Sequence, residues 1–359
     1  MSYLNPFQGI PKKLDLSPGC LVNPYMYLEL LLDFNPRRHF KEQGKESFYK
    51  QVFVAPEKEE KDEKRERKLK EFLNEYPDSP IAHMFIRALD GDAAEKSRIE
   101  SMGAYQLCFH QIMEPSYPLS YLLELDHLSH AWTVERGKDN YIQAWEEFLN
   151  SPLIEPAVWP DLFEVLGRKL PNSELLCRWV IAMELHLSHL VAGDVEYQRS
   201  MHASDTPIKE LVPKEDESTE NPAALFFQWL RTTTGTSSLP ELMRLDANQL
   251  LDADESKWKR WKRGDFFPSF DSFEKLVEVF KRFSSAEAIQ HRFYMAKALN
   301  FWGYYSTSLM QKYHDLPNET KRALAPFPIY PHGYSSFSSW IQARYPFWLD
   351  YHQKRYRES

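Results

Sequence analysis

Hydrophobic residues recur along most of the chain at spacings of three and four, which is typical of helices that bury one face. Two such stripes consist of Tyr121, Leu125, Leu128 and Trp132, and of Tyr141, Trp145 and Phe148. Residues 176–191 are apolar on nearly every side, which predicts a buried helix. The pattern therefore predicts an all-α protein, either an irregular helical bundle or a short array of helical hairpins.

Polar stretches separate these helical segments. In residues 57–71, 14 of 15 side chains are charged and the signs alternate, which predicts an exposed helix supported by i,i+4 pairs. A solvated surface explains this run better than an interaction face does. The sequence Pro-Asp-Ser-Pro at 77–80 predicts a break before the next helix. The hairpins are similar to tetratricopeptide repeats, although they have no regular period.

Composition shifts suggest where the chain divides. Residues 203–222 are acidic, polar and bounded by proline, so they are expected to form a linker. The linker would separate a helical N-terminal domain, residues 1–202, from a segment with a basic motif, residues 223–285. An aromatic-rich helical segment, residues 286–359, would follow.

The overall composition narrows the class of protein. The 359 residues are 43% hydrophobic, with 12 glycines and 24 prolines, which indicates an ordered helical chain. The net charge of −8 argues against a protein that coats nucleic acid over its whole surface. No run approaches the roughly 20 apolar residues of a membrane span, and no secretory signal is evident at residues 1–11. We therefore expect a cytoplasmic protein with no membrane partner.

The three cysteines are Cys20, Cys108 and Cys177. Their number is odd, and their separations fit neither a disulfide framework nor a metal site. We expect small buried hydrophobic residues in a reducing compartment.

A compact motif lies between residues 256 and 280. Trp261-Lys262-Arg263-Gly264 is followed by Pro268-Ser269 and then by apolar residues at helical spacing, namely Phe273, Leu276, Val277 and Phe280. Gly264 suits the left-handed position that ends a helix, and Ser269 suits the cap of the next helix. These residues resemble the second half of a Cro/lambda-repressor-type (XRE) helix-turn-helix.

The resemblance implies two further helices upstream, over residues 238–245 and 246–253. Leu251 stands where that family has the apolar residue of its second helix. Asp252 replaces the usual turn glycine, and Lys262 replaces the usual glutamate. The resemblance covers about 45 residues and implies contact with duplex DNA, by a dimer on two half-sites if recognition is sequence-specific.

Helical geometry divides the candidate recognition helix into two faces. Trp258 and Trp261 share one face, which is expected to be buried. The charged side chains would then point outward or lie on the flanks: Lys259, Arg260 and Arg263 outward, with Lys257 and Lys262 on either side. Five positive charges in seven residues suit phosphate contacts, and an outward arginine can read guanine in the major groove.

Two histidine pairs offer a different chemistry. His-Leu-Ser-His occurs at His127–His130 and again at His186–His189, and residues three apart share one helical face. Two such pairs on facing helices form a candidate metal site, although structural histidines explain the repeat better. No glycine-rich phosphate loop or nucleophile elbow occurs, so no cofactor is expected.

Three functions remain open. The favoured one is a prokaryotic-type DNA-binding protein in transcription regulation, with the N-terminal helices as a sensor, dimerisation or partner domain. The alternative is a helical protein–protein interaction adaptor, with another protein or a second copy as partner, in which the helix-turn-helix is only structural. A metal-dependent enzyme ranks third.

Overall fold

The protein is described by a computed structural model. The described residues are 20–22, 24, 26, 41–44, 62–109, 115–138, 141–158, 162–168, 170, 173–204, 206–214, 221–246, 249–265, 267–324 and 334–358. Their helices are α4 (Asp62–Leu73), α5 (Pro80–Leu89), α6 (Ala93–Ser101), α7 (Ala104–Phe109), α8 (Tyr117–Gly137), α9 (Tyr141–Leu149), α10 (Leu162–Gly167), α11 (Ser173–Ser200), α12 (Pro207–Leu211), α13 (Pro222–Thr234), α14 (Leu239–Arg244), α15 (Glu255–Arg263), α16 (Phe270–Phe280), α17 (Ala286–His314), α18 (Asn318–Leu324) and α19 (Phe337–Glu358). A 3-10 turn, Glu155–Ala157, lies between α9 and α10. The described part of the chain holds no β-sheet, so the predicted all-α class is confirmed.

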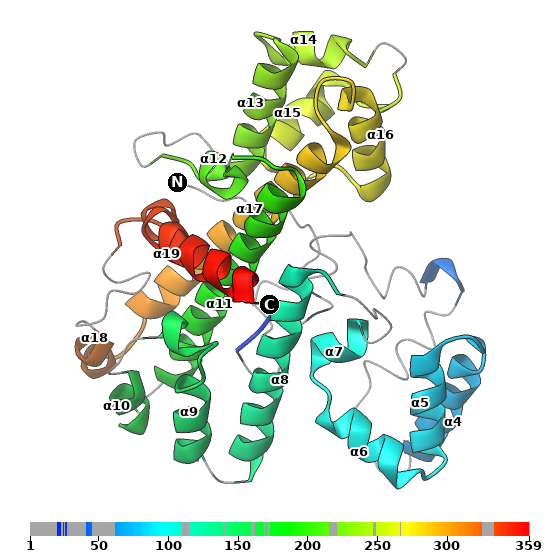
Figure 1. Ribbon diagram of the computed structural model, residues 1–359, viewed down its shortest axis with the longest axis vertical. Helices are drawn as coiled ribbons and strands as arrows, with labels where there is room; N and C mark the ends of the chain where they lie inside the picture. Colours follow the sequence, from blue (N-terminus) through cyan, green and yellow to red (C-terminus); the bar gives the residue numbers. More distant parts are fainter. Residues whose placement is uncertain are drawn as a thin grey trace.

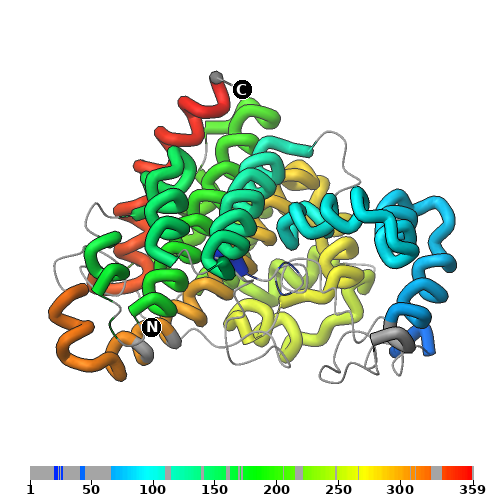
Figure 2. Tube along the Cα trace, turned by 90° about the horizontal axis from the view of Figure 1, so that it is seen from below, coloured from blue at the N-terminus to red at the C-terminus, as the bar shows by residue number. Residues whose placement is uncertain are grey.

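The helices form three groups around two long central helices (Figure 1). Helices α13 to α16 gather at one end of α11 and α17, whereas α8, α9, α10 and α19 surround the rest of α11. Helices α4 to α6 project from one side of this body, as the blue and cyan segments in Figure 2 show. The structure is therefore an irregular bundle with a projecting helical hairpin.

Helix α11 is the centre of the core. Nearly every residue from Leu176 to Val195 is buried, which confirms the prediction of a buried helix. Among the described residues, α11 is the helix whose length and composition would also allow it to cross a membrane. Its most apolar 18-residue stretch is 83% buried inside the molecule. Packing against α8, α17 and α19 therefore accounts for its apolar character.

Glu184 on α11 holds α19 in place. Its side chain is buried, and its carboxylate accepts hydrogen bonds from the indole N–H groups of Trp340 and Trp348, both at 2.9 Å. The guanidinium of Arg344 completes the shell, with Nε 3.0 Å from Oε1. A buried carboxylate is costly unless it is paired and hydrogen-bonded, so these partners fix the register of α19 against α11.

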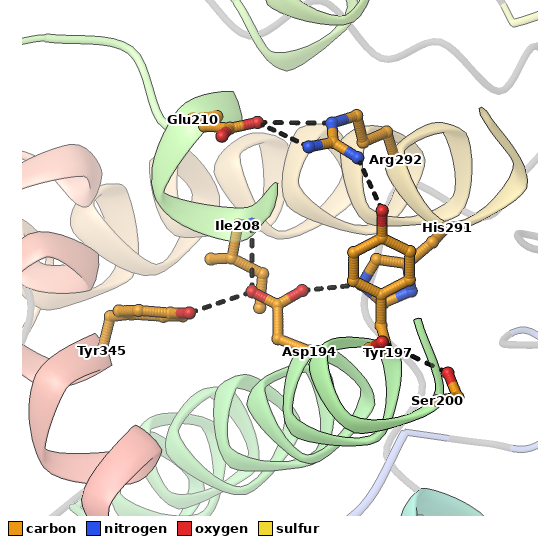
Figure 3. A network of polar contacts seen from close by, with 8 residues as sticks. All are labelled: Asp194, Tyr197, Ser200, Ile208, Glu210, His291, Arg292 and Tyr345. Carbon is orange, nitrogen blue, oxygen red and sulfur yellow. Dashed lines mark hydrogen bonds and ion pairs between the residues drawn. The ribbon is translucent and has the colours of Figure 1, made fainter. Parts of the chain in front are cut away.

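Asp194, ten residues further along α11, connects three other elements (Figure 3). Its buried carboxylate accepts the backbone N–H of Ile208 at 3.1 Å and the hydroxyl of Tyr345 at 3.0 Å. Nε2 of His291 lies 2.7 Å away. One carboxylate thus joins α11 to α12, α17 and α19.

The prediction of a linker over residues 203–222 is wrong for the first half of this range. Helix α12 lies inside it and packs against α17, with Ile208 and Leu211 fully buried. Glu210 pairs with the buried Arg292 of α17, its Oε2 3.0 Å from Nη2. The acidic residue that marked a linker is therefore the partner of a buried cation. Residues 215–220 lie outside the described residues.

The boundary expected between residues 285 and 286 is also not a structural division. Helix α17 begins there and packs against α13 and α16 as well as α11 and α12. Helices of the basic segment therefore pack directly on the first helix of the following segment.

The predicted hairpins are present in the N-terminal half. Ser79 caps α5 by accepting the N–H of Ala82 at 3.3 Å, so the break at 77–80 is confirmed. The two predicted apolar stripes, one on α8 and one on α9, face each other where these helices pack. The ring centroids of Trp132 and Trp145 lie 4.7 Å apart there. The charged run forms the start of α4 from Asp62, and residues 57–61 lie outside the described residues.

Three histidines packed around α11 predict how stability depends on pH. Burial lowers the pKa of His186 to about 4 and those of His189 and His352 to about 3. Below the ordinary histidine pKa of about 6.5, the unfolded chain binds protons that the folded chain excludes. The free energy of unfolding should therefore be largest near neutral pH and fall as the pH drops from about 6.5 toward 4. Urea denaturation across this range tests the prediction, which is contradicted if the midpoint stays constant down to about pH 4.5.

Removing the charge of Glu184 tests its role in docking α19. Glu184→Gln should lower the free energy of unfolding by on the order of 3 kcal/mol, because Arg344 loses its buried partner. Glu124→Gln is the matched control, since Glu124 pairs with Arg355 of α19 at a much more exposed site. This control should cost less than about 1 kcal/mol. Equal losses in urea denaturation would contradict the assigned role of Glu184.

Candidate nucleic-acid interface

Helix α15 has well-defined caps at both ends. Asp254 begins it by accepting the N–H of Lys257 at 2.7 Å. Gly264 ends it with a φ of +74°, and the N–H of Asp265 reaches back to the carbonyl of Arg260 at 3.1 Å. This is the left-handed helix end that the motif predicted for Gly264.

Two tryptophans anchor the inner face of α15. Trp258 and Trp261 are each 1% exposed, and their ring centroids lie 5.5 Å apart. Trp258 also meets the ring of Phe227 from α13 at 5.8 Å and that of Phe280 from α16 at 6.4 Å. Aromatic edge-to-face packing of this kind fixes the rotation of α15 about its axis. The predicted inner face is confirmed.

The basic side chains lie where the helical geometry placed them. The exposed ones are Lys259, Arg260 and Arg263, and the half-buried ones on the flanks are Lys257 and Lys262. The ammonium of Lys257 lies 5.3 Å from the centroid of the Trp261 ring, a cation–π contact. The outward face of α15 is therefore positively charged.

Carboxylates already pair with part of this face. Nζ of Lys259 lies 2.6 Å from Oε1 of Glu255, and the guanidinium of Arg263 donates twice to Oδ2 of Asp265, at 2.6 and 3.0 Å. Exposed ion pairs contribute only about 0–1 kcal/mol, so a phosphate can displace them. Cations in the last turn also stabilise the negative end of the helix dipole.

The second half of the motif lies at the start of α16. Ser269 caps this helix by accepting the N–H of Ser272 at 3.4 Å, and Pro268 lies buried just before it. Phe273 and Leu276 are buried, and the Phe273 ring stacks on that of Phe293 in α17 with centroids 3.8 Å apart. The aromatic core thus joins α16 to α17.

The upstream half differs from the expected helix-turn-helix. Helix α14 matches the first expected helix, but none of the described residues in 246–253 is helical. The side chain of Asp246 instead accepts the N–H groups of Leu250 at 2.8 Å and Leu251 at 3.0 Å. Short polar side chains compete in this way with the helical backbone bonds. The described residues between α14 and α15, 245, 246 and 249–254, accordingly form a non-helical connection.

Two details of the upstream prediction survive in this connection. Leu251 is buried, as the apolar residue of the family pattern would be. Asp252 has a φ of +43°, so it adopts the left-handed conformation that a turn glycine would provide. Aspartate tolerates this conformation better than most residues do.

The N-terminal end of α15 is acidic. A hollow of about 580 Å³ lies between it and α14, lined by Arg244 and by the four carboxylates of Asp246, Asp252, Asp254 and Glu255. The two ends of α15 therefore differ in charge, with the cations of Arg260 and Arg263 at the other end. An anionic surface would approach α15 from its C-terminal end.

Asn221 was not singled out from the sequence. Its side chain accepts the N–H of Ala224 at 2.9 Å, which caps α13, and donates to the carbonyl of Arg263 at 2.7 Å. One amide thus joins the start of α13 to the end of α15. The signal for the cap was the Asn-Pro pair at 221–222, because an N-cap asparagine before a first-turn proline is a helix start. The hydrogen bond to Arg263 could not be predicted in this way, because only the folded chain brings the two residues together.

The histidine pairs do not form a metal centre. His127 is exposed, Nε2 of His130 lies 2.7 Å from the carbonyl of Glu100, and Nδ1 of His186 lies 2.8 Å from that of Ala182. His186 lies close enough to His189 to lower the pKa of His189 beyond the effect of burial. The described residues contain no group of three or more histidine, cysteine or acidic side chains placed to bind a metal.

The cysteines are poor nucleophiles. Cys20 and Cys177 are buried, and Cys108 is partly buried. Burial raises the pKa of the first two thiols to about 12 and that of Cys108 to about 11. The thiolate is therefore scarce near neutral pH at each position.

Gly264 provides a test of the helix end at the interface. Gly264→Ala should lower the free energy of unfolding by about 1–2 kcal/mol through its left-handed φ, and further because the new Cβ would lie 3.3 Å from Oδ1 of Asn221. Gly235→Ala is the control, since Gly235 has a φ of +69° and no atom near the position of a Cβ. The measurement is thermal unfolding of both variants. A smaller loss at Gly264 than at Gly235 would contradict the crowding at Asn221.

Comparisons with known proteins assign the chain to no family. No family model, no curated protein and no solved structure matches it. The resemblance to the Cro/lambda-repressor type consequently depends on the motif residues alone, and function has to be inferred from the geometry of the site.

Proposed function

We propose that the protein is a DNA-associated regulatory protein whose helix α15 contacts duplex DNA through Lys259, Arg260 and Arg263. The observation that carries this proposal is the exposure of three cationic side chains on one face of a helix that two buried tryptophans hold in place. Because the helix is already held rigidly, little conformational entropy of its backbone is lost when its charged side chains bind a partner. This arrangement favours binding to a regular array of phosphates.

The charge distribution along α15 supports a particular mode of contact. In helix-turn-helix proteins, the N-terminal residues of the recognition helix contact base edges. Here that end carries Asp252, Asp254 and Glu255, whose charges repel phosphate, and a long connection precedes it. The cations lie toward the C-terminal half. Contact through the DNA backbone, with little reading of bases, therefore fits the geometry better than insertion into the major groove.

Removal of two charges from α15 tests the proposal. Arg260→Ala/Arg263→Ala should weaken binding to a fluorescent duplex and reduce the salt slope by up to about 2, because two phosphate contacts are lost. The measurement is fluorescence anisotropy between about 50 and 200 mM salt. Varying the duplex sequence should change the affinity little.

Lys96→Ala/Arg98→Ala is the matched control. It removes the same net charge from the exposed face of α6, which lies far from α15 (Figure 1). It should leave the salt slope nearly unchanged. An equal effect of the two double variants would mean that only the overall charge matters, and the absence of binding at low salt would exclude DNA contact by α15.

An adaptor function is the second candidate. The same group of helices exposes three large apolar side chains, Leu250, Phe270 and Phe283, each between 38% and 46% exposed. Aromatic residues such as Phe270 and Phe283 are enriched at protein interfaces. If α15 fails to bind DNA in a folded protein, a protein partner that covers these residues becomes the better explanation.

A further inference from the structure

A pocket of about 660 Å³ opens between α8, α11 and α17, away from α15. Its volume falls within the range of sites for small organic molecules. The start of α8, the second half of α11 and the first half of α17 form its sides. None of the proposed DNA contacts takes part in it.

The walls of this pocket are mainly apolar and aromatic. The side chains that form them include Leu119, Leu122, Leu190, Tyr197, Tyr294 and Met295. Gly193 lies in the floor where α11 approaches α17, and a Cβ there would lie 3.1 Å from Cε of Met295. A larger residue at this position would press on the side chain of Met295, which also lines the pocket. The surface therefore suits a hydrophobic skeleton with aromatic or aliphatic groups.

The ionisable groups in the pocket are acidic or histidine, and no lysine or arginine occurs among the described lining residues. Glu196 lies half-buried in the wall, and Glu287 lies exposed at the mouth. His189 contributes no positive charge at neutral pH, because burial lowers its pKa to about 3. His291 lies against the buried Asp194 carboxylate, which offsets any positive charge on its ring. The remaining charges, those of Glu196 and Glu287, favour a cation over an anion.

The polar wall is held rigidly (Figure 3). His291 is fixed from behind by Asp194, at 2.7 Å, and its ring lies parallel to that of Tyr197 with centroids 4.5 Å apart. Tyr197 in turn accepts a hydrogen bond from Arg292 at 3.2 Å. The rings of Tyr197 and His291 are thus preorganised, which lowers the entropic cost of binding.

We propose that this pocket is a binding site for a hydrophobic organic cation, such as an aromatic compound that carries an amine or a quaternary ammonium group. The apolar part lies against the leucines and Met295. The positive group lies near Glu196 and Glu287, where the ring of Tyr294 adds cation–π attraction. This function is separate from DNA contact and does not depend on it.

Rhodamine 6G, a fluorescent hydrophobic cation, is the probe, and fluorescein, an anion with the same fused ring system, is the comparison. Fluorescence anisotropy with the full chain and no DNA should show saturable binding of rhodamine 6G and none of fluorescein. Glu196→Gln/Glu287→Gln should raise the Kd of rhodamine 6G by about tenfold or more. Glu146→Gln/Glu147→Gln removes two exposed carboxylates of α9, outside the pocket, and should leave the Kd unchanged.

A second variant blocks the pocket sterically and separates a loss of binding from a loss of folding. Gln290→Trp places a large ring at the exposed mouth of the pocket and should also weaken binding, while circular dichroism and Tm stay unchanged. Three results would overturn the proposal: no binding of rhodamine 6G up to about 100 μM, equal binding of fluorescein, or equal Kd values for the two double glutamine variants.

Discussion

The burial of two carboxylates in one apolar helix constrains most of this structure. Glu184 is 6% exposed and Asp194 is fully buried, and an unpaired charge in either position would be strongly destabilising. The chain satisfies them with indole, guanidinium, phenol, imidazole and backbone donors from α12, α17 and α19. Hydrophobic contact brings these helices to α11, but it tolerates many registers. The directional hydrogen bonds select one.

The sequence predicted those parts of the fold that depend on local periodicity. The spacing of hydrophobic residues is a property of neighbouring positions. It predicts the apolar stripes of α8 and α9 and the almost wholly apolar surface of α11. The division into domains depends on distant contacts and was less predictable. Glu210 reads as part of an acidic linker, yet its partner Arg292 is 82 residues away. The charge composition of a segment does not distinguish a carboxylate exposed to solvent from one that pairs with a buried cation.

The local geometry of α15 and α16 was predicted where it depends on neighbouring residues. The caps at Gly264 and Ser269 and the inner tryptophans depend on the helix that carries them, so motif and geometry agree. The missing second helix was not predictable from its apolar Leu251, because Asp246 competes for the backbone. The acidic residues at the start of α15 can be seen in the sequence. Only the structure shows that they line a hollow beside α14. The pocket was not predicted, since its walls come from three separate helices.

The hydrogen bonds between α11 and α19 also have a consequence for the order of folding in time. Glu184 and Trp340 are 156 residues apart, and Asp194 and Tyr345 are 151 apart. At about 5–20 residues per second, a ribosome needs roughly 8–30 s to synthesise the chain between them. During that interval α11 has its apolar surface but not the donors from α19. The nascent chain therefore passes through a state with an incomplete core, in which chaperone binding and misassembly compete with folding.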